Sequence, residues 1–174
     1  MADRGEATQF GSVGERPPGA SGRSRSDVSE RGWVSIENAI EVSRSPEDVF
    51  DYLTDITKEF EWNPRTRRAE KLTPGPIGPG TRFGAEWIKG NPTIVEYVRF
   101  EPPMAWVSIA RSRRLDAKSE GQISPTEQGS RVVVRTKLRP KGFLALLLPL
   151  MRRMMQGRED QNLERVKAIL EGTG

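Results

Sequence analysis

The first regular pattern of apolar and polar positions lies between residues 33 and 42. Apolar side chains stand at alternate positions over most of this segment: Val34, Ile36, Ile40 and Val42. Alternation with a period of two is typical of a strand that buries one face and exposes the other. We therefore expect a half-buried β-strand here.

A helix start follows this strand. Ser45 is a good N-cap residue, Pro46 suits the first helical position, and Asp48 stands three residues after the serine, as in a capping box. The pattern predicts a short helix from Pro46. A second short helix is expected over about 56–62, ending before Pro64 because proline disfavours helical backbone at the residue that precedes it.

The pattern in the middle of the chain predicts further strands, each short and bounded by turn residues: 68–72, 82–88, 93–100, 105–110, 115–123 and 131–138. No helical pattern separates them, so consecutive strands should pair as an antiparallel meander. In the last strand, Val132 and Val134 face one way while Arg131 and Arg135 face the other. This alternation puts one face on an interior and the other in water.

The densest apolar run of the chain covers residues 143–151. It is far too short to cross a bilayer, which takes about 20 residues. Arg152 and Arg153 end it. A transmembrane helix is therefore not expected.

A helical pattern follows Pro149 and continues to Gly172, so a long C-terminal helix should lie with one face on the sheet. Glu159 and Asn162 interrupt its apolar stripe. A solid core tolerates such polar residues poorly. One interpretation is that the helix rotates or kinks and turns both side chains toward solvent.

Composition divides the chain into an arm and a domain. Only 34% of the residues are apolar and the mean hydropathy is -0.63. Residues 1–31 account for much of this polarity, since they are rich in Gly, Pro, Ser and Arg and show no apolar period. We expect 1–31 to be a disordered arm and 32–172 to be one folded domain. The arm lacks the apolar stretch of a signal peptide, which favours a cytoplasmic location.

The chain contains no cysteine and no histidine. Disulfides, thiolate metal sites and Ser-His-Asp or Cys-His catalysis are therefore excluded, and no glycine-rich phosphate loop is present. We expect neither a metal nor a cofactor. The remaining candidates for acid–base chemistry are Glu86, Glu96, Tyr97, Glu159 and Arg99. Strand alternation puts Glu86 and Glu96 on the face opposite to Trp87 and Tyr97, so one pocket cannot hold them all, which weighs against an enzyme.

The net charge of +4 comes from basic clusters in the folded part, such as RTRR at 65–68 and RSRR at 111–114. Such charge is usually a solvated face. The arginines of the arm lack interleaved aromatic residues, so no nucleic-acid partner is expected. Arg152 and Arg153 beside the apolar run suggest a transient contact with an anionic membrane, at about 1 kcal/mol per charge close to the surface.

Four segments carry a family resemblance: IEVSRSPEDVFDYLTDITKEFEWNP at 40–64, PGPIGPGTRF at 74–83, YVRFEPP at 97–103, and GSRVVVRTKL at 129–138 leading into a Leu-rich, Pro-interrupted helix. Their order and spacing resemble the SRPBCC superfamily. This superfamily includes START lipid-transfer domains, birch-pollen-allergen-type proteins, polyketide cyclases and the G-type subunit of carbon monoxide dehydrogenase. The resemblance spans about residues 33–172.

The resemblance implies the α+β helix-grip fold, in which a curved seven-stranded antiparallel sheet wraps around a long C-terminal helix, with two short helices after strand 1. It also implies a cavity that holds an apolar ligand, with Pro149 between a mobile lid and the helix. The candidates for this cavity are Trp62, Phe83, Trp87, Tyr97, Trp106, Val134, Leu147, Met151, Met155, Glu159 and Asn162. Ordinary packing in the core or on the surface is the alternative for each.

Three functions follow from the resemblance. The first is a carrier or sequestering protein for a lipid-like or polycyclic molecule, which needs only a cavity. The second is a polyketide cyclase or aromatase, which also needs an acid or base inside the cavity. The third is a module that recruits a partner protein or a membrane. The scarcity of acid–base groups favours the carrier.

Overall fold

The computed structural model describes residues 33–88, 92–113, 115–142 and 148–172, and gives the backbone alone for 148–155. The arm predicted at 1–31 lies outside these ranges. The lid predicted before Pro149 also lies outside them, because residues 143–147 are not described.

Helices and strands follow the predicted order. They are β1 (Val34–Val42), α1 (Pro46–Thr54), the 3-10 turn η1 (Ile56–Lys58), α2 (Glu59–Trp62), β2 (Thr66–Lys71), β3 (Arg82–Trp87), β4 (Thr93–Glu101), β5 (Ala105–Arg111), β6 (Leu115–Thr126), β7 (Gly129–Pro140) and α3 (Leu148–Glu171). The strands form one seven-stranded antiparallel sheet in the order β1-β7-β6-β5-β4-β3-β2. The predicted helix-grip fold is therefore confirmed.

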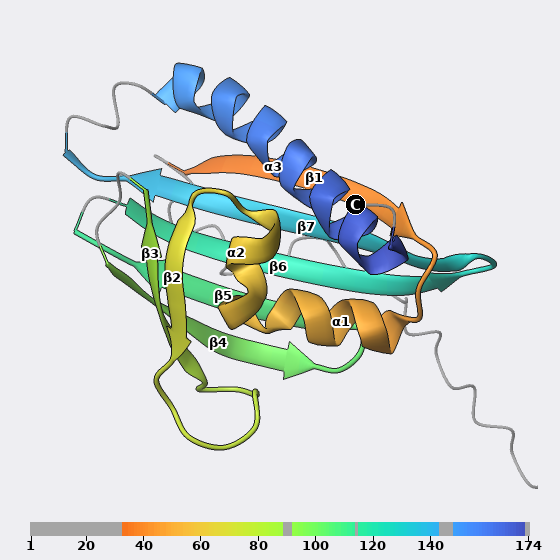
Figure 1. Ribbon diagram of the computed structural model, residues 1–174. Coiled ribbons are helices and arrows are strands. Elements are labelled where there is room, and N and C mark those ends of the chain that lie inside the picture. The colour runs from red at the N-terminus through yellow and green to blue at the C-terminus, as the bar shows by residue number, and fades with distance from the viewer. Residues whose placement is uncertain (1–32, 89–91, 114, 143–147, 173–174) are drawn as a thin grey trace, which may run out of the picture. The chain divides into compact units, whose positions relative to one another are not determined.

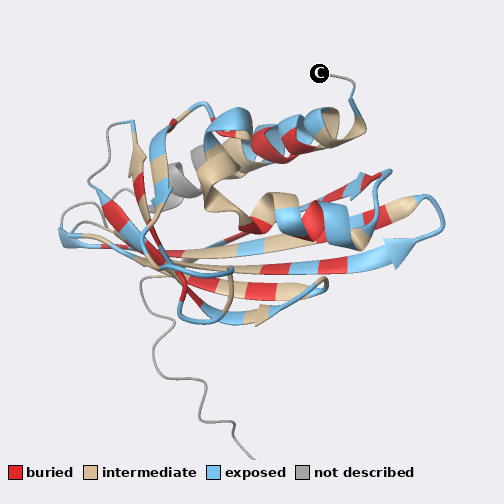
Figure 2. Ribbon diagram, turned by 60° about the horizontal axis from the view of Figure 1, so that its bottom comes forward, coloured by how far each residue is buried: buried red, intermediate tan, exposed pale blue. Residues whose placement is uncertain are grey.

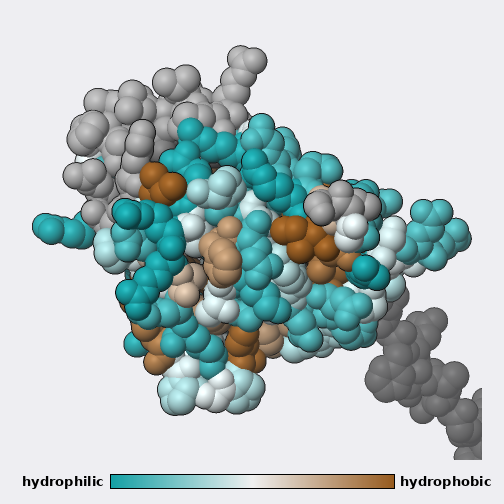
Figure 3. All heavy atoms as spheres, in the orientation of Figure 1, coloured by the Kyte–Doolittle hydropathy of each residue, from teal (hydrophilic) through white to brown (hydrophobic). Residues whose placement is uncertain are grey.

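The helices all cover one face of the curved sheet (Figures 1 and 2). α3 runs along β1, α1 lies over β6 and β7, and α2 lies against α3 and the edge strand β2 (Figure 1). In the same orientation the surface is mostly hydrophilic, with separate apolar spots (Figure 3). The apolar interior thus lies between the sheet and the helices.

The β6–β7 hairpin is longer than the pattern predicted. Ladder pairing continues to Thr126 and Gly129, so only Glu127 and Gln128 form the turn. Gly129 has φ +147, and a Cβ there would lie 2.2 Å from the carbonyl oxygen of Val42. Glycine at this position lets the hairpin pass close to the end of β1.

Capping interactions and the backbone preferences of proline and glycine explain where the helices begin and end. The Oγ of Ser45 accepts a hydrogen bond from the backbone N–H of Asp48 at 3.2 Å, as the capping pattern predicted. α3 begins at Leu148, one residue before Pro149, so the proline lies in the first turn, where no intrahelical partner for an N–H is needed. Gly172, at φ +71, ends α3 in the left-handed conformation.

Aromatic side chains close one end of the space between sheet and helices. Phe50 of α1 is 1% exposed and packs edge-on against Phe100 and Trp106, with ring centroids 5.0 and 5.7 Å away. Tyr97 packs edge-on against Phe100 and Phe83 at 5.2 and 6.0 Å. Such pairs contribute about 0.5–1.5 kcal/mol each beyond the area they bury. This cluster is the solid part of the core.

Two β-bulges and one glycine accompany the curvature of the sheet. The register shifts between Thr66 and Arg68 in β2 and between Tyr97 and Arg99 in β4. Bulges bend a strand and increase its twist. The ring of Trp106 lies directly over Gly121 of β6, where no other residue would leave room for it.

Candidate functional site

A cavity of about 620 Å³ lies between the sheet and the helices. Its lining comes from α1, η1 and α2, from the middle of α3 and from the concave face of the sheet, with residues of β1 and of β3 through β7. This volume is within the range of pockets that bind small organic molecules.

Small side chains on two neighbouring strands explain why protein side chains do not fill this space. Ser108 and Ala110 of β5 lie directly opposite Ser119 and Ala117 of β6, and all four line the cavity. Alternation puts these positions on the face that points toward α3. Larger residues at the same positions would fill the volume with side-chain atoms.

The remaining wall is largely apolar. Val95, Tyr97 and Trp106 line it from β4 and β5, and Val134 and Leu163 line it from β7 and α3. The Oη of Tyr97 is occupied, since it donates a hydrogen bond to the carbonyl oxygen of Thr54 at 2.9 Å. Burial raises the pKa of Tyr97 far above its ordinary value. Tyr97 is therefore a structural donor and not an available acid.

Glu59 organises the polar end of the cavity. Its Oε1 accepts hydrogen bonds from Trp87 Nε1 at 2.9 Å, from Asn63 Nδ2 at 2.6 Å and from Thr66 Oγ1 at 3.0 Å. These bonds connect α2 to β2 and β3. Because three donors converge on one carboxylate oxygen, this side chain is held in place.

Glu159 of α3 lines the cavity in a more apolar setting. Its hydrogen-bond partner is Asn162, whose Nδ2 lies at the long distance of 3.4 Å from Oε2. Burial is the main cause that raises the pKa of Glu159 above its ordinary value; the Asn162 contact opposes this shift, and the nearby charge of Glu59 adds to it. Glu59 and Glu159 thus both line the cavity, but Glu59 accepts three hydrogen bonds on one oxygen whereas Glu159 has one long hydrogen bond.

Trp62 and two arginines complete this end. The indole Nε1 of Trp62 is buried and has no hydrogen-bond acceptor among the described residues. Arg65 and Arg158 also line the cavity. Within the described ranges, neither guanidinium has an acceptor or an ion-pair partner.

Six of the eleven predicted cavity residues line the cavity: Trp62, Trp87, Tyr97, Trp106, Val134 and Glu159. Phe83 is fully buried behind the lining, against Tyr97. Asn162 is 5% exposed and does not line the cavity, because its amide lies between Glu159 and Arg165, with Arg165 Nη1 donating to Oδ1 at 3.2 Å. Residue 147 and the side chains of Met151 and Met155 lie outside the described part of the chain.

Sequence reasoning missed Glu59, Asn38 and the two arginines. Asn38 interrupts the alternation of β1 between Ile36 and Ile40, so a polar residue at a buried position was already visible. Its Nδ2 donates to Asp160 Oδ1 of α3. Glu59 carried no such signal, since its role depends on strands that are distant in the sequence.

Two of the predicted acid–base candidates lie on the outer face of the sheet. Glu86 pairs with Arg67 at 3.5 Å, and Glu96 pairs with Arg82 at 3.0 Å. Neither lines the cavity. This agrees with the face assignment made from strand alternation.

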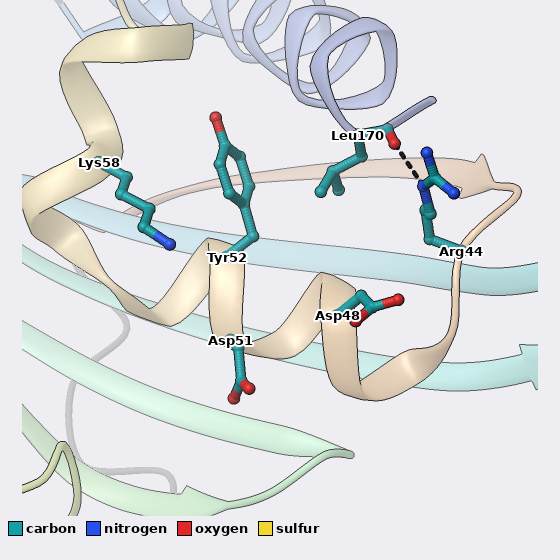
Figure 4. Close-up of a pocket in the computed structure, with 6 residues that line it drawn as sticks. All are labelled: Arg44, Asp48, Asp51, Tyr52, Lys58 and Leu170. Carbon is teal, nitrogen blue, oxygen red and sulfur yellow. Dashed lines mark hydrogen bonds between the residues drawn. The ribbon is translucent and has the colours of Figure 1, made fainter. Parts of the chain in front are cut away.

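A second hollow, of about 340 Å³, lies on the surface between α1 and the end of α3 (Figure 4). Arg44 Nε donates to the carbonyl oxygen of Leu170 across it, and Lys58 Nζ lies 5.6 Å from the ring centroid of Tyr52. Asp48 and Asp51 point outward from α1 (Figure 4). Its charged lining and its opening to solvent distinguish it from the apolar cavity.

Glu159→Gln should make the protein more stable at pH 8. A carboxyl whose pKa is raised in the folded state favours folding below its ordinary pKa of 4.5 and loses that contribution as the pH rises through the folded value. The amide of the variant carries no charge, so folding at pH 8 no longer buries an ionised carboxylate. Urea denaturation midpoints at pH 5 and pH 8 should show an advantage of the variant that grows with pH.

The matched control for this comparison is Glu164→Gln, at an exposed position of the same helix. It should change the denaturation midpoint little at either pH. A Glu159→Gln protein that is less stable than the parent at pH 8 would show that the carboxylate has a stabilising partner.

Neither a membrane span nor a metal cluster is found in the described ranges. No helix there is both long and apolar enough to cross a membrane. No three Asp or Glu side chains in those ranges gather as metal ligands would.

Solved structures similar to this chain share its fold at low sequence identity. The di-domain ARO/CYC protein StfQ from the steffimycin biosynthetic pathway is 19% identical with a TM-score of 0.65, over 80% of this chain and 51% of that protein. A START superfamily protein from Mycobacterium smegmatis is 13% identical with a TM-score of 0.64, over 80% and 99% of the two chains. TTHA0849 from Thermus thermophilus is 15% identical with a TM-score of 0.67, over 81% and 99%.

No curated protein matches the chain. The family model described as polyketide cyclase / dehydrase and lipid transport matches residues 34–171, which include every strand and helix given above. The superfamily expected from the four sequence segments is thereby confirmed. The chain belongs to the polyketide cyclase / dehydrase and lipid transport family.

Proposed function

We propose that this protein binds a hydrophobic small molecule in the cavity between the sheet and α3, and acts as its carrier or store. The observation that carries this proposal is the volume of about 620 Å³ over the small residues of β5 and β6. The fold does not need an apolar cavity of this size for its stability, because the aromatic cluster beside it is well packed. The cavity suits a lipid-like or polycyclic molecule that water would otherwise solvate poorly.

The proposal is tested with Nile red, a neutral polycyclic dye whose fluorescence rises in apolar surroundings. One molecule should bind per chain. About -0.3 kcal/mol per non-hydrogen atom for a ligand of drug size corresponds to a dissociation constant on the order of micromolar. Native mass spectrometry of protein purified gently from its host should also show a bound apolar molecule. If the purified protein carries no bound molecule and does not bind the dye, the proposal is wrong.

One observation favours cyclase chemistry as a second candidate function. Glu159 lines the cavity with a raised pKa, so it is a candidate proton donor to a bound carbonyl group. StfQ, whose name includes ARO/CYC, shares the fold. A carrier leaves its ligand chemically unchanged, whereas a cyclase converts it. Mass analysis of a polyketide-type ketone before and after incubation with the protein separates the two functions.

The membrane contact expected from Arg152 and Arg153 stays a prediction, because their side chains are not described. It concerns the delivery of a ligand and is separate from its binding. Co-sedimentation with liposomes should increase with anionic lipid content if the contact exists. Equal sedimentation with neutral and anionic liposomes would contradict it.

A further inference from the structure

The polar end of the cavity has more hydrogen-bond donors than acceptors. Glu59 is occupied on Oε1 by three donors. Trp62 has a buried indole N–H without an acceptor in the described chain. Arg65 and Arg158 add two guanidinium groups, each with five N–H donors. A ligand that complements this end must therefore bring acceptor atoms.

The charges that line the cavity also favour a ligand with hydrogen-bond acceptors. Several arginines on the outer face of the sheet are paired with a carboxylate: Arg67 with Glu86, Arg82 with Glu96, and Arg135 with Glu37. Arg65 and Arg158 differ from these, since none of the described carboxylates lies within ion-pair distance of either one. Two carboxyl groups line the same cavity, Glu59 and Glu159. Glu59 Oε1 already accepts from three neutral donors, and the burial of Glu159 disfavours its charged form, so the two acids offset the charge of the two arginines only in part.

The two arginines reach the cavity from different elements. Arg65 follows α2 immediately before β2, and Arg158 stands on the first half of α3. The wall away from them is apolar, with Val95, Trp106 and Val134. The cavity is thus amphipathic, with cationic donors from two elements and an apolar body.

We propose that the ligand is an amphipathic organic anion whose carboxylate is bound by Arg65 and Arg158 while its apolar body fills the cavity over β5 and β6. This inference rests on the proposed function and names the chemical class of the ligand. The planar guanidinium group is well matched to a carboxylate, with which it forms paired hydrogen bonds. An anion at this place also supplies the acceptors that the described residues lack.

The test uses ten-carbon ligands that differ only in the head group: decanoate, 1-decanol and decylammonium. Each is titrated at pH 7.5, below its micelle concentration, against protein that carries Nile red. Decanoate should displace the dye at a concentration at least about tenfold below that of decylammonium, since hydrogen bonds to charged groups are the strong ones. Equal displacement, or tighter binding of the ammonium ligand, would overturn the inference.

Arg65→Gln/Arg158→Gln should reduce the affinity for decanoate about tenfold or more and leave that for 1-decanol nearly unchanged. Arg65 and Arg67 differ by two residues, and Arg67 points to Glu86 on the outer face, so Arg67→Gln is the matched control and should bind all three ligands like the parent. An unchanged preference in the double variant would overturn the inference.

Failure of the inference and failure of the proposed function give different results. If Nile red does not bind and the purified protein carries no apolar molecule, the carrier function is wrong. If the dye binds but decanoate neither displaces it nor outcompetes decylammonium, the cavity binds apolar molecules and the anionic class is wrong.

Discussion

Gly121→Ala should destabilise the fold by about 2–3 kcal/mol, the upper part of the usual range for an overpacked core. A Cβ at this position would lie 2.1 Å from Cζ2 of Trp106 and 2.3 Å from two further ring atoms. The ring cannot yield freely, because Trp106 is 6% exposed and packs edge-on against Phe50 at 5.7 Å. The urea denaturation midpoint of the variant should therefore fall clearly below that of the parent.

The direction in which Trp106 can move makes this variant informative about function. Phe50 blocks one side of the ring, and the cavity lies on another, because Trp106 also lines it. The substitution should thus push the ring into the ligand volume and weaken Nile red binding as well. Stability and binding should decline together.

Gly157→Ala is the matched control for this substitution. Gly157 lies within α3 and is exposed, and apart from its chain neighbours and the backbone of its own helix no atom lies within 4 Å of the added Cβ. Alanine inside a helix is favoured over glycine by about 0.5–1 kcal/mol, so this variant should be more stable than the parent. If both variants raised the denaturation midpoint, the close contact at Gly121 would be wrong.

The elements were predictable where local pattern and local chemistry agree. The alternation at Ile36 and Ile40 marks β1, and the Ser45 cap with Pro46 sets the start of α1 to the residue. These signals depend on neighbours in the sequence, which the pattern contains. The order of the elements then carried the resemblance that implied the fold.

The bulges and the long hairpin were not predictable in this way. The register shift between Tyr97 and Arg99 depends on how β4 pairs with β5, and the extension to Gly129 depends on a close approach of Val42. Both are long-range effects. Strand ends therefore differed from the pattern while strand order did not.

The candidate site was predictable on the strands and less so at its polar end. Alternation placed Trp106, Ser108 and Ala110 on one face, and the structure brings them to the cavity. The sequence pattern did not identify Glu59, because its partners Trp87 and Thr66 belong to strands that fold back onto α2. The sequence pattern also does not show that Glu59 and Glu159, which lie on different helices, line the same cavity.

Ala110→Phe/Ala117→Phe should abolish most ligand binding while leaving the fold intact, with a loss of roughly 10–100-fold in Nile red affinity. The two alanines are direct cross-strand partners on β5 and β6, and both line the cavity. Two phenyl rings there occupy the volume that the ligand needs. A ligand that must compete with these rings meets an overpacking cost of about 1–3 kcal/mol, which corresponds to this loss in affinity.

Ile109→Phe/Lys118→Phe is the control that separates occlusion from a general effect of added aromatic residues. Ile109 and Lys118 are also direct partners on the same two strands, one residue away, and neither lines the cavity. Alternation puts them on the opposite face of the sheet. This control should bind the dye like the parent, and both variants should unfold cooperatively in urea. If the dye binds equally to both variants, it binds outside the cavity, and the small residues of β5 and β6 are not the reason that this protein takes up apolar molecules.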